Sequence, residues 1–291
     1  MDAVVAHIVE HLDPNPSPPL FIAVQGPQGS GKTYLSAELK DRLSAPPYAL
    51  NVALLSIDDL YLTHDGLVSL ASQEPPNALW AGRGQPGTHD VGLGVQVLEA
   101  LRSQSGSVEL PRFDKSLFNG EGDRLSTGLV VTPPFDIVIL EGWCVGFFPI
   151  PQGELERRWE GVWREVSAKL GLPHTVTKHD LERVNETLKG YVAMWSYFDI
   201  FVQIKPTPVE TPTTQYSIIY RWRLEQEHNM KALNGGHGMS DDAVKSFVDR
   251  YIPGYVFFGD IPPMFSQHPW TGNGLRLLID EQRHQVGVET F

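Results

Sequence analysis

Residues 26–33 read GPQGSGKT, which fits the pattern Gly-x-x-x-x-Gly-Lys-(Ser/Thr). This octapeptide follows the short apolar run Leu20–Val24 and precedes the segment Thr33–Leu43, in which leucine recurs every fourth residue. That spacing is typical of one face of a helix. A strand, a glycine-rich turn and a helix in this order predict a loop whose backbone N–H groups surround phosphate oxygens. The alternative, a chance glycine-rich turn, explains neither the strand before it nor the helix after it.

The phosphate-binding loop, called the P-loop below, is expected to hold a nucleotide. Its residues are Gly26, Pro27, Gln28, Gly29, Ser30, Gly31, Lys32 and Thr33. In loops of this pattern the lysine reaches the β- and γ-phosphates and the final hydroxyl binds Mg²⁺. We therefore expect Lys32 to take part in catalysis, Thr33 to bind the metal, and ATP and Mg²⁺ to be the cofactors.

Short apolar runs alternate with helical patterns along the chain. After Leu20–Val24, the runs are Leu50–Ile57, Ile137–Leu140, Ile200–Ile204 and Leu275–Ile279. Apolar residues at helical spacing lie between them, in segments 155–170, 181–195 and 240–251. Buried strands of a parallel sheet are short and apolar, and turn or acidic residues bound them. The pattern predicts an α/β fold with a parallel sheet of about five strands flanked by helices. We expect a single domain over residues 1–291.

The composition restricts the class of partner. The formal net charge is −12 at pH 7 and no long lysine or arginine run occurs, so we expect binding to neither nucleic acid nor membrane. One cysteine, Cys144, excludes an internal disulfide framework and a multi-cysteine zinc site. Met1–Leu12 lacks the basic region of a signal peptide, so a cytoplasmic location is expected. The sequence gives no indication of the oligomeric state.

Acidic residues follow two of the expected strands. Asp58 and Asp59 follow the second strand and Glu141 follows the third. The carboxyl ends of parallel strands face one crevice, which also holds the P-loop. One carboxylate there can accept the proton of an attacking hydroxyl group, and another can bind Mg²⁺ or its water. Asp58 and Glu141 are candidates for both roles. The alternative is that these residues cap helices or face solvent, and for Asp59 capping is an equal alternative.

Five segments together resemble a known family. They are GPQGSGKT (26–33), SIDDLYLT (56–63), GRGQPGTHD (82–90), LPRFDKSLFNGEGDR (110–124) and ILEGWCVGF (139–147). In this order they resemble the D-glycerate 3-kinase family and its related ATP-dependent kinases. These belong with the phosphoribulokinase, uridine kinase and pantothenate kinase group of P-loop enzymes. The resemblance covers nearly the whole chain, since DDAVKSFVDRYIPGY (241–255) also fits.

The resemblance implies transfer of the ATP γ-phosphate to a hydroxyl group of D-glycerate or a similar small hydroxy acid. It also implies that Asp58 lies near the reacting hydroxyl. Two alternatives remain open at this point. One is a nucleoside or sugar kinase on the same scaffold. The other is an ATP-binding regulatory or assembly protein without a metabolite acceptor.

An anionic acceptor beside ATP requires cations in a chain that is net acidic. Two long polar, glycine- and proline-rich segments near 74–94 and 110–128 supply Arg83, His89, Arg112, Lys115 and Arg124. Arginine binds a carboxylate through two parallel hydrogen bonds, and lysine offers a point charge. We expect these residues, together with Asp59 and Tyr61, to bind the acceptor. Surface charges or loop-fixing salt bridges are the alternative, and the Asp90 next to His89 is expected to cap the helix that begins near Val91.

Arg221 and Arg223 lie in a helical pattern after the fourth strand, within a candidate lid near 213–238. In P-loop kinases, arginines of such a lid close on the transferring phosphoryl group. The alternative is a charged helix face balanced by Glu225 and Glu227. The sequence favours neither.

Overall fold

The computed structural model describes residues 1–13, 18–207, 214–233 and 235–291. Within these residues the central layer is a six-stranded sheet with strand order β10-β9-β8-β1-β7-β2. Five neighbouring strands run parallel. They are β1 (Leu20–Gln25), β2 (Val52–Ser56), β7 (Ile137–Gly142), β8 (Ile200–Pro206) and β9 (Gly274–Ile279). These strands coincide with the five apolar runs, which confirms the predicted α/β fold.

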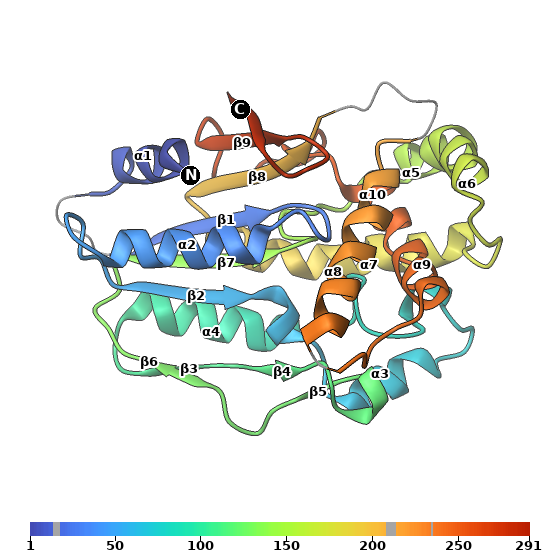
Figure 1. The fold of residues 1–291 in the computed structure, drawn as a ribbon, viewed down its shortest axis with the longest axis horizontal. Coiled ribbons are helices and arrows are strands. Elements are labelled where there is room, and N and C mark those ends of the chain that lie inside the picture. The colour runs from blue at the N-terminus through green and yellow to red at the C-terminus, as the bar shows by residue number, and fades with distance from the viewer. Residues whose placement is uncertain (14–17, 208–213, 234) are drawn as a thin grey trace.

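The sixth strand, β10 (Gln285–Thr290), pairs antiparallel with β9 at the edge of the sheet. It was not predicted from the sequence. All of its residues are exposed or half-buried, so it has no apolar run to mark it. Its position keeps the turn between β9 and β10 at the end of the sheet where the P-loop lies (Figure 1).

Helices cover both faces of the sheet (Figure 1). Among the described residues the α-helices are α1 (Asp2–Glu10), α2 (Lys32–Ser44), α3 (His64–Ala71), α4 (Val91–Ser103), α5 (Gln152–Arg158), α6 (Arg164–Leu170), α7 (Lys178–Trp195), α8 (Ser217–Leu233), α9 (Asp241–Asp249) and α10 (Ile252–Phe258). The pattern at 155–170 forms α5 and α6, joined by a π-helical turn over Trp159–Trp163. In the pattern at 240–251, α9 ends before Pro253, which occupies the first turn of α10.

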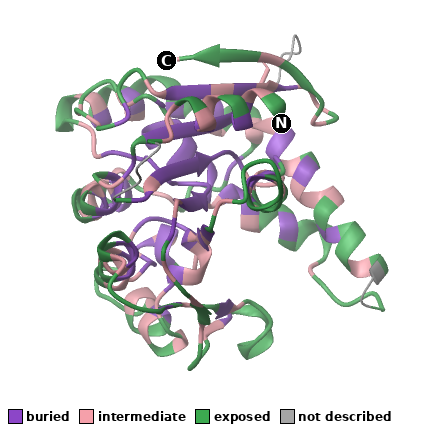
Figure 2. Ribbon diagram, turned by 90° about the vertical axis from the view of Figure 1, so that its left-hand side faces the viewer, coloured by how far each residue is buried: buried purple, intermediate pink, exposed green. Residues whose placement is uncertain are grey.

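The strands point their carboxyl ends toward the side of the molecule that α8, α9 and α10 occupy (Figure 1). Every residue of β7 is buried, as are all residues of β1 after Leu20. Figure 2 shows this burial, with the central strands largely buried and the outer helix faces and loops exposed. A parallel sheet covered on both faces leaves its strand ends as the natural place for polar chemistry.

The segment predicted as a long loop at 110–128 contains a short ribbon. Strand β4 (Phe113–Asp114) pairs antiparallel with β5 (Asp123–Arg124), while β3 (Val108–Leu110) pairs with β6 (Leu129–Val131). The ribbon lies against η1 (Ile57–Leu60), the 3-10 turn that follows β2. An isolated bridge joins Tyr61 to His89, so all three segments with acceptor candidates meet in one region.

None of the helices in the described ranges has both the length and the apolar character that crossing a membrane requires.

Candidate active site

The P-loop has the backbone geometry that phosphate binding requires. Gly29 and Gly31 have φ angles of +75° and +89°, in the left-handed region that favours glycine. A Cβ atom added to Gly29 would lie 2.5 Å from the Cβ of Trp222, so the loop and α8 are in close contact. Gly31 is the N-cap of α2 and has no side chain to satisfy the first N–H groups of the helix. These N–H groups and the helix dipole therefore favour an anion at this position.

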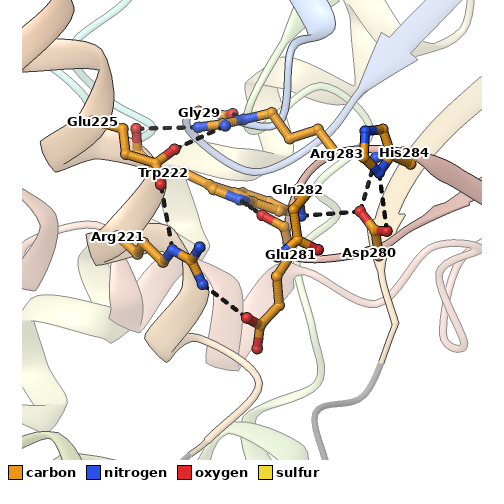
Figure 3. Close-up of polar contacts among 9 residues, drawn as sticks. All are labelled: Gly29, Arg221, Trp222, Glu225, Asp280, Glu281, Gln282, Arg283 and His284. Atoms are coloured by element: carbon orange, nitrogen blue, oxygen red, sulfur yellow. Dashed lines mark hydrogen bonds and ion pairs between the residues drawn. The ribbon is translucent and has the colours of Figure 1, made fainter.

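The turn between β9 and β10 supports the P-loop from outside (Figure 3). The Arg283 Nε donates a hydrogen bond of 2.6 Å to the Gly29 carbonyl oxygen, and Nη1 lies 2.9 Å from the Glu225 carboxylate. The Trp222 indole N–H donates to the Glu281 carbonyl oxygen at 2.8 Å. One turn thus holds the P-loop and α8 together. Arg283 is not among the residues predicted from the sequence, because no local pattern connects it with a loop 254 residues earlier.

The two lid candidates are paired with carboxylates of the protein. Arg221 contacts Glu225 at 3.3 Å and Glu281 at 2.7 Å, as Figure 3 shows. Arg223 contacts the buried Glu227 at 2.8 Å. This geometry is that of the charged helix face, the alternative stated above. Closure on a phosphoryl group stays a prediction, and positions 213 and 234 of the expected lid lie outside the described residues.

Thr33 and Glu141 form the candidate magnesium site. The Thr33 hydroxyl donates to Glu141 Oε1 at 3.2 Å, across the carboxyl ends of β1 and β7. Glu141 is 4% exposed, and its Oε2 has no hydrogen-bond partner among the residues that the structure describes. A buried carboxylate with a free oxygen beside a hydroxyl suits a hard cation. No group of three or more His, Cys, Asp or Glu within the described ranges could hold a metal alone, and Mg²⁺ commonly takes its other ligands from phosphates and water.

Asp58 lies where the acceptor segments meet the P-loop. Its Oδ2 is 2.5 Å from Lys115 Nζ, and its Oδ1 accepts the Tyr61 hydroxyl at 3.0 Å. Burial raises the pKa of Asp58, but the Lys115 ion pair and the charge of Lys32 outweigh it and hold the pKa below its ordinary value. The carboxylate is therefore ionised at neutral pH and able to accept a proton from a bound hydroxyl group.

His89 completes this group. Its ring is 4% exposed and stacks on Tyr61, with ring centroids 4.5 Å apart. Its Nδ1 lies 2.8 Å from the hydroxyl of Tyr191. Burial lowers the pKa of His89 to about 4, although the charge of Asp58 opposes the change, so the ring is neutral at pH 7.

Asp59 and Arg112 contact one another and the ribbon. The Asp59 carboxylate accepts the Phe113 N–H at 3.0 Å and lies 3.8 Å from Arg112. Burial raises the pKa of Asp59, and these two contacts oppose the increase. The pair fixes the ribbon against η1 in this structure, and its contact with an acceptor stays a prediction.

Two further arginines of the predicted acceptor site bind the protein itself. Arg83 donates to the carbonyl oxygens of Gly120 and Glu121. Arg124 donates to the Tyr61 carbonyl oxygen and lies 3.2 Å from Asp90. This is the loop-fixing arrangement that the sequence left as an alternative.

Asp90 is the N-cap of α4 and accepts the Leu93 N–H, which confirms the expected cap.

Of the predicted site residues, the structure brings five into one group: Lys32, Asp58, Tyr61, His89 and Lys115. Arg83, Arg112 and Arg124 shape the loops around this group.

No protein-family model matches the chain. A solved structure of D-glycerate 3-kinase from Cryptococcus neoformans var. grubii is 40% identical, with a TM-score of 0.86 over 100% of this chain and 96% of that chain. The chloroplastic D-glycerate 3-kinase of Arabidopsis thaliana is 34% identical over 98% of this chain, which spans 58% of the length of that protein. The uncharacterized kinase mug58 of Schizosaccharomyces pombe is 34% identical over 98% of both chains.

Proposed function

The chain belongs to the D-glycerate 3-kinase family, and from this premise we propose that it transfers the γ-phosphate of ATP to a hydroxyl group of D-glycerate or a similar small hydroxy acid. The observation that carries the proposal is the half-buried Asp58 carboxylate, which is paired with Lys115 and also lies within the electrostatic influence of Lys32 of the P-loop. A base, an anion-binding cation and a phosphate-binding loop meet there.

Asp58 acts as the general base of the proposed reaction. Its carboxylate accepts the proton of the acceptor hydroxyl while the hydroxyl oxygen attacks the γ-phosphorus and ADP leaves. Lys32 neutralises charge on the transferring group, and the N–H groups at the start of α2 hold the phosphates. Direct in-line transfer accounts for the reaction without a covalent intermediate on the protein.

Lys115 orients the acceptor in this proposal. Its ammonium group has three N–H donors, of which one meets Asp58. Its side chain is 54% exposed, so the remaining donors are accessible to the carboxylate of a hydroxy acid. The same ammonium group lowers the pKa of Asp58, so one residue contacts both the acid that binds and the proposed base.

Thr33 and Glu141 would hold Mg²⁺, with Asp58 as the alternative ligand. The ion, when bound, neutralises charge on the β- and γ-phosphates. The Oε2 of the buried Glu141 lacks a hydrogen-bond partner among the described residues, which supports this assignment over a purely structural role. A small-molecule partner, a cytoplasmic location and the absence of nucleic-acid binding are further proposals that the sequence supports.

An acceptor panel tests the proposal. ADP formation would be measured with D-glycerate, L-glycerate, other hydroxy acids, sugars and nucleosides, and each product identified by ³¹P NMR. We expect rapid ADP formation with D-glycerate or another small hydroxy acid and a phosphate ester as the product. Preference for a nucleoside or sugar would favour the first alternative. ADP formation that is independent of every acceptor would favour a regulatory ATP-binding protein.

A further inference from the structure

A chain of buried hydrogen bonds lies behind Asp58, on the side of α7. Tyr191 of α7 is fully buried, and its hydroxyl oxygen accepts the Gly87 N–H at 2.8 Å. The same hydroxyl is 2.8 Å from His89 Nδ1. Neither the resemblance nor the sequence pattern assigned a role to Tyr191, which belongs to the apolar stripe of a helix.

The position of each proton in this series of hydrogen bonds follows from the number of donors and acceptors. A hydroxyl group has one proton to donate. Burial raises the pKa of Tyr191 well above its ordinary value, so the hydroxyl keeps that proton, although the backbone N–H groups of Gly87 and His89 oppose the change. Within the described ranges, His89 Nδ1 is the acceptor that the structure offers it. A buried hydroxyl proton without an acceptor would be destabilising, so Tyr191 donates to Nδ1.

This bond determines the tautomer of His89. A neutral imidazole has one nitrogen with a proton and one without. Because Nδ1 accepts, the proton lies on Nε2. The Nε2 atom is buried, and none of the residues that the structure describes provides it with a partner. The ring stacks on Tyr61, whose hydroxyl binds Asp58, so the unpaired donor lies in the group around the proposed base.

We propose that Tyr191 is a positioning residue that holds His89 as the Nε2–H tautomer, and that His89 donates this neutral N–H to an oxygen atom of the acceptor. The proposal rests on the proposed function and adds a specificity determinant to it. A neutral donor does not repel Lys115 and leaves Asp58 as the proton acceptor. An acceptor without an oxygen atom at that position would leave the buried N–H unpaired and would bind weakly.

Two substitutions of His89 distinguish the hydrogen bond from Nε2 to the acceptor from the hydrogen bond between Nδ1 and Tyr191. The amide nitrogen of glutamine reaches about as far as Nε2 of histidine, while that of asparagine reaches about as far as Nδ1. We expect His89→Asn to raise the KM of the hydroxy acid roughly ten- to a hundredfold and to leave the KM of ATP unchanged, because a directional contact with the acceptor is lost. His89→Gln should retain most of the affinity.

A third variant tests the positioning role. Tyr191→Phe should raise the KM of the acceptor, and Tyr197→Phe is the matched control because its hydroxyl binds the exposed Glu99 instead. The control should leave both KM values unchanged.

The tautomer is measured without any substrate, by long-range ¹H–¹⁵N NMR of histidine-labelled protein at pH 7. The His89 signal is identified by its loss in His89→Gln. We expect a proton on Nε2 in the wild type and a mixture of tautomers in Tyr191→Phe. A proton on Nδ1 in the wild type would overturn the proposal, as would His89→Asn that binds the acceptor better than His89→Gln. If the wild type phosphorylates no hydroxy acid, the proposed function fails, and the NMR spectrum still decides the tautomer.

Discussion

Arg283 joins the turn between β9 and β10 to two other elements, and its replacement by alanine releases both. The substitution removes the 2.6 Å bond to the Gly29 carbonyl oxygen and the 2.9 Å ion pair with Glu225. It also removes the stacking of the guanidinium group over Trp222, where the carbon of the group is 5.3 Å from the ring centroid. The P-loop then loses its support on the side that faces α8.

The magnitude follows from the exposure of each group. A hydrogen bond from a charged donor contributes roughly 1.5–3 kcal/mol when it is buried, and the 30% exposure of Arg283 places this bond near the lower limit. The ion pair contributes only about 0.2–1 kcal/mol, because Glu225 is 41% exposed. Together they give about 2 kcal/mol, which lowers the Tm of a chain of this length by roughly 3 °C. Because the loop is no longer fixed, the KM of ATP should rise about tenfold.

Steady-state kinetics and thermal unfolding provide the assay, and Glu225→Gln is the control. That variant removes the ion pair and keeps the bond from Arg283 to the Gly29 carbonyl oxygen. We expect Arg283→Ala to raise the KM of ATP and to leave the KM of the acceptor unchanged, while Glu225→Gln changes each by less than about twofold. Equal effects of the two variants on the KM of ATP would refute the assigned role of the Gly29 contact. An unchanged KM of ATP in Arg283→Ala would refute it as well.

Three further outcomes are expected. Lys32→Ala should abolish phosphoryl transfer and leave the circular dichroism spectrum unchanged, and wild-type turnover would contradict the ATP site. Lys115→Ala should raise the acceptor KM about ten- to a hundredfold, through loss of a charge-assisted contact, with little change in the ATP KM; the reverse pattern would contradict the acceptor site. Hydrogen bonds from Arg157 and then Arg158 lower the pKa of Glu154 from 4.5 to about 2 despite partial burial. The contribution of Glu154 to the free energy of unfolding should therefore be complete above pH 4.5 and disappear as the pH falls toward 2. Urea unfolding of wild type and Glu154→Gln at several pH values measures this, and a difference independent of pH would contradict it.

The sheet and the P-loop could be predicted because their signals are local. Apolar runs mark β1, β2, β7, β8 and β9, since strands covered on both faces are built mostly from apolar residues. The acidic residues after β2 and at the end of β7 could be assigned to one crevice from the sequence, because the carboxyl ends of parallel strands lie at one edge of the sheet.

The contacts that position the site were not predictable, because they join distant parts of the chain. In the sequence, Tyr191 is one of several residues in the apolar stripe of a helix. Only the packing of α7 places its hydroxyl beside His89, 102 residues away. The charge of Arg83 and Arg124 suits an anionic acceptor, but the sequence could not show that carbonyl oxygens of the protein accept hydrogen bonds from both side chains. Charge can be counted from a sequence, whereas its partner depends on the fold.

The assignment of Asp58 as the base and Glu141 as the metal ligand is tested most directly by comparing Asp58→Asn with Glu141→Gln. The kcat of each variant would be measured at saturating ATP and acceptor across a titration of Mg²⁺. We expect Asp58→Asn to lose roughly 10²–10⁴-fold in kcat at every Mg²⁺ concentration, because an amide cannot accept the hydroxyl proton. Glu141→Gln should instead require more Mg²⁺ and recover part of its activity as Mg²⁺ rises. Near-normal kcat in Asp58→Asn, with Glu141→Gln inactive at all Mg²⁺ concentrations, would contradict the assignment.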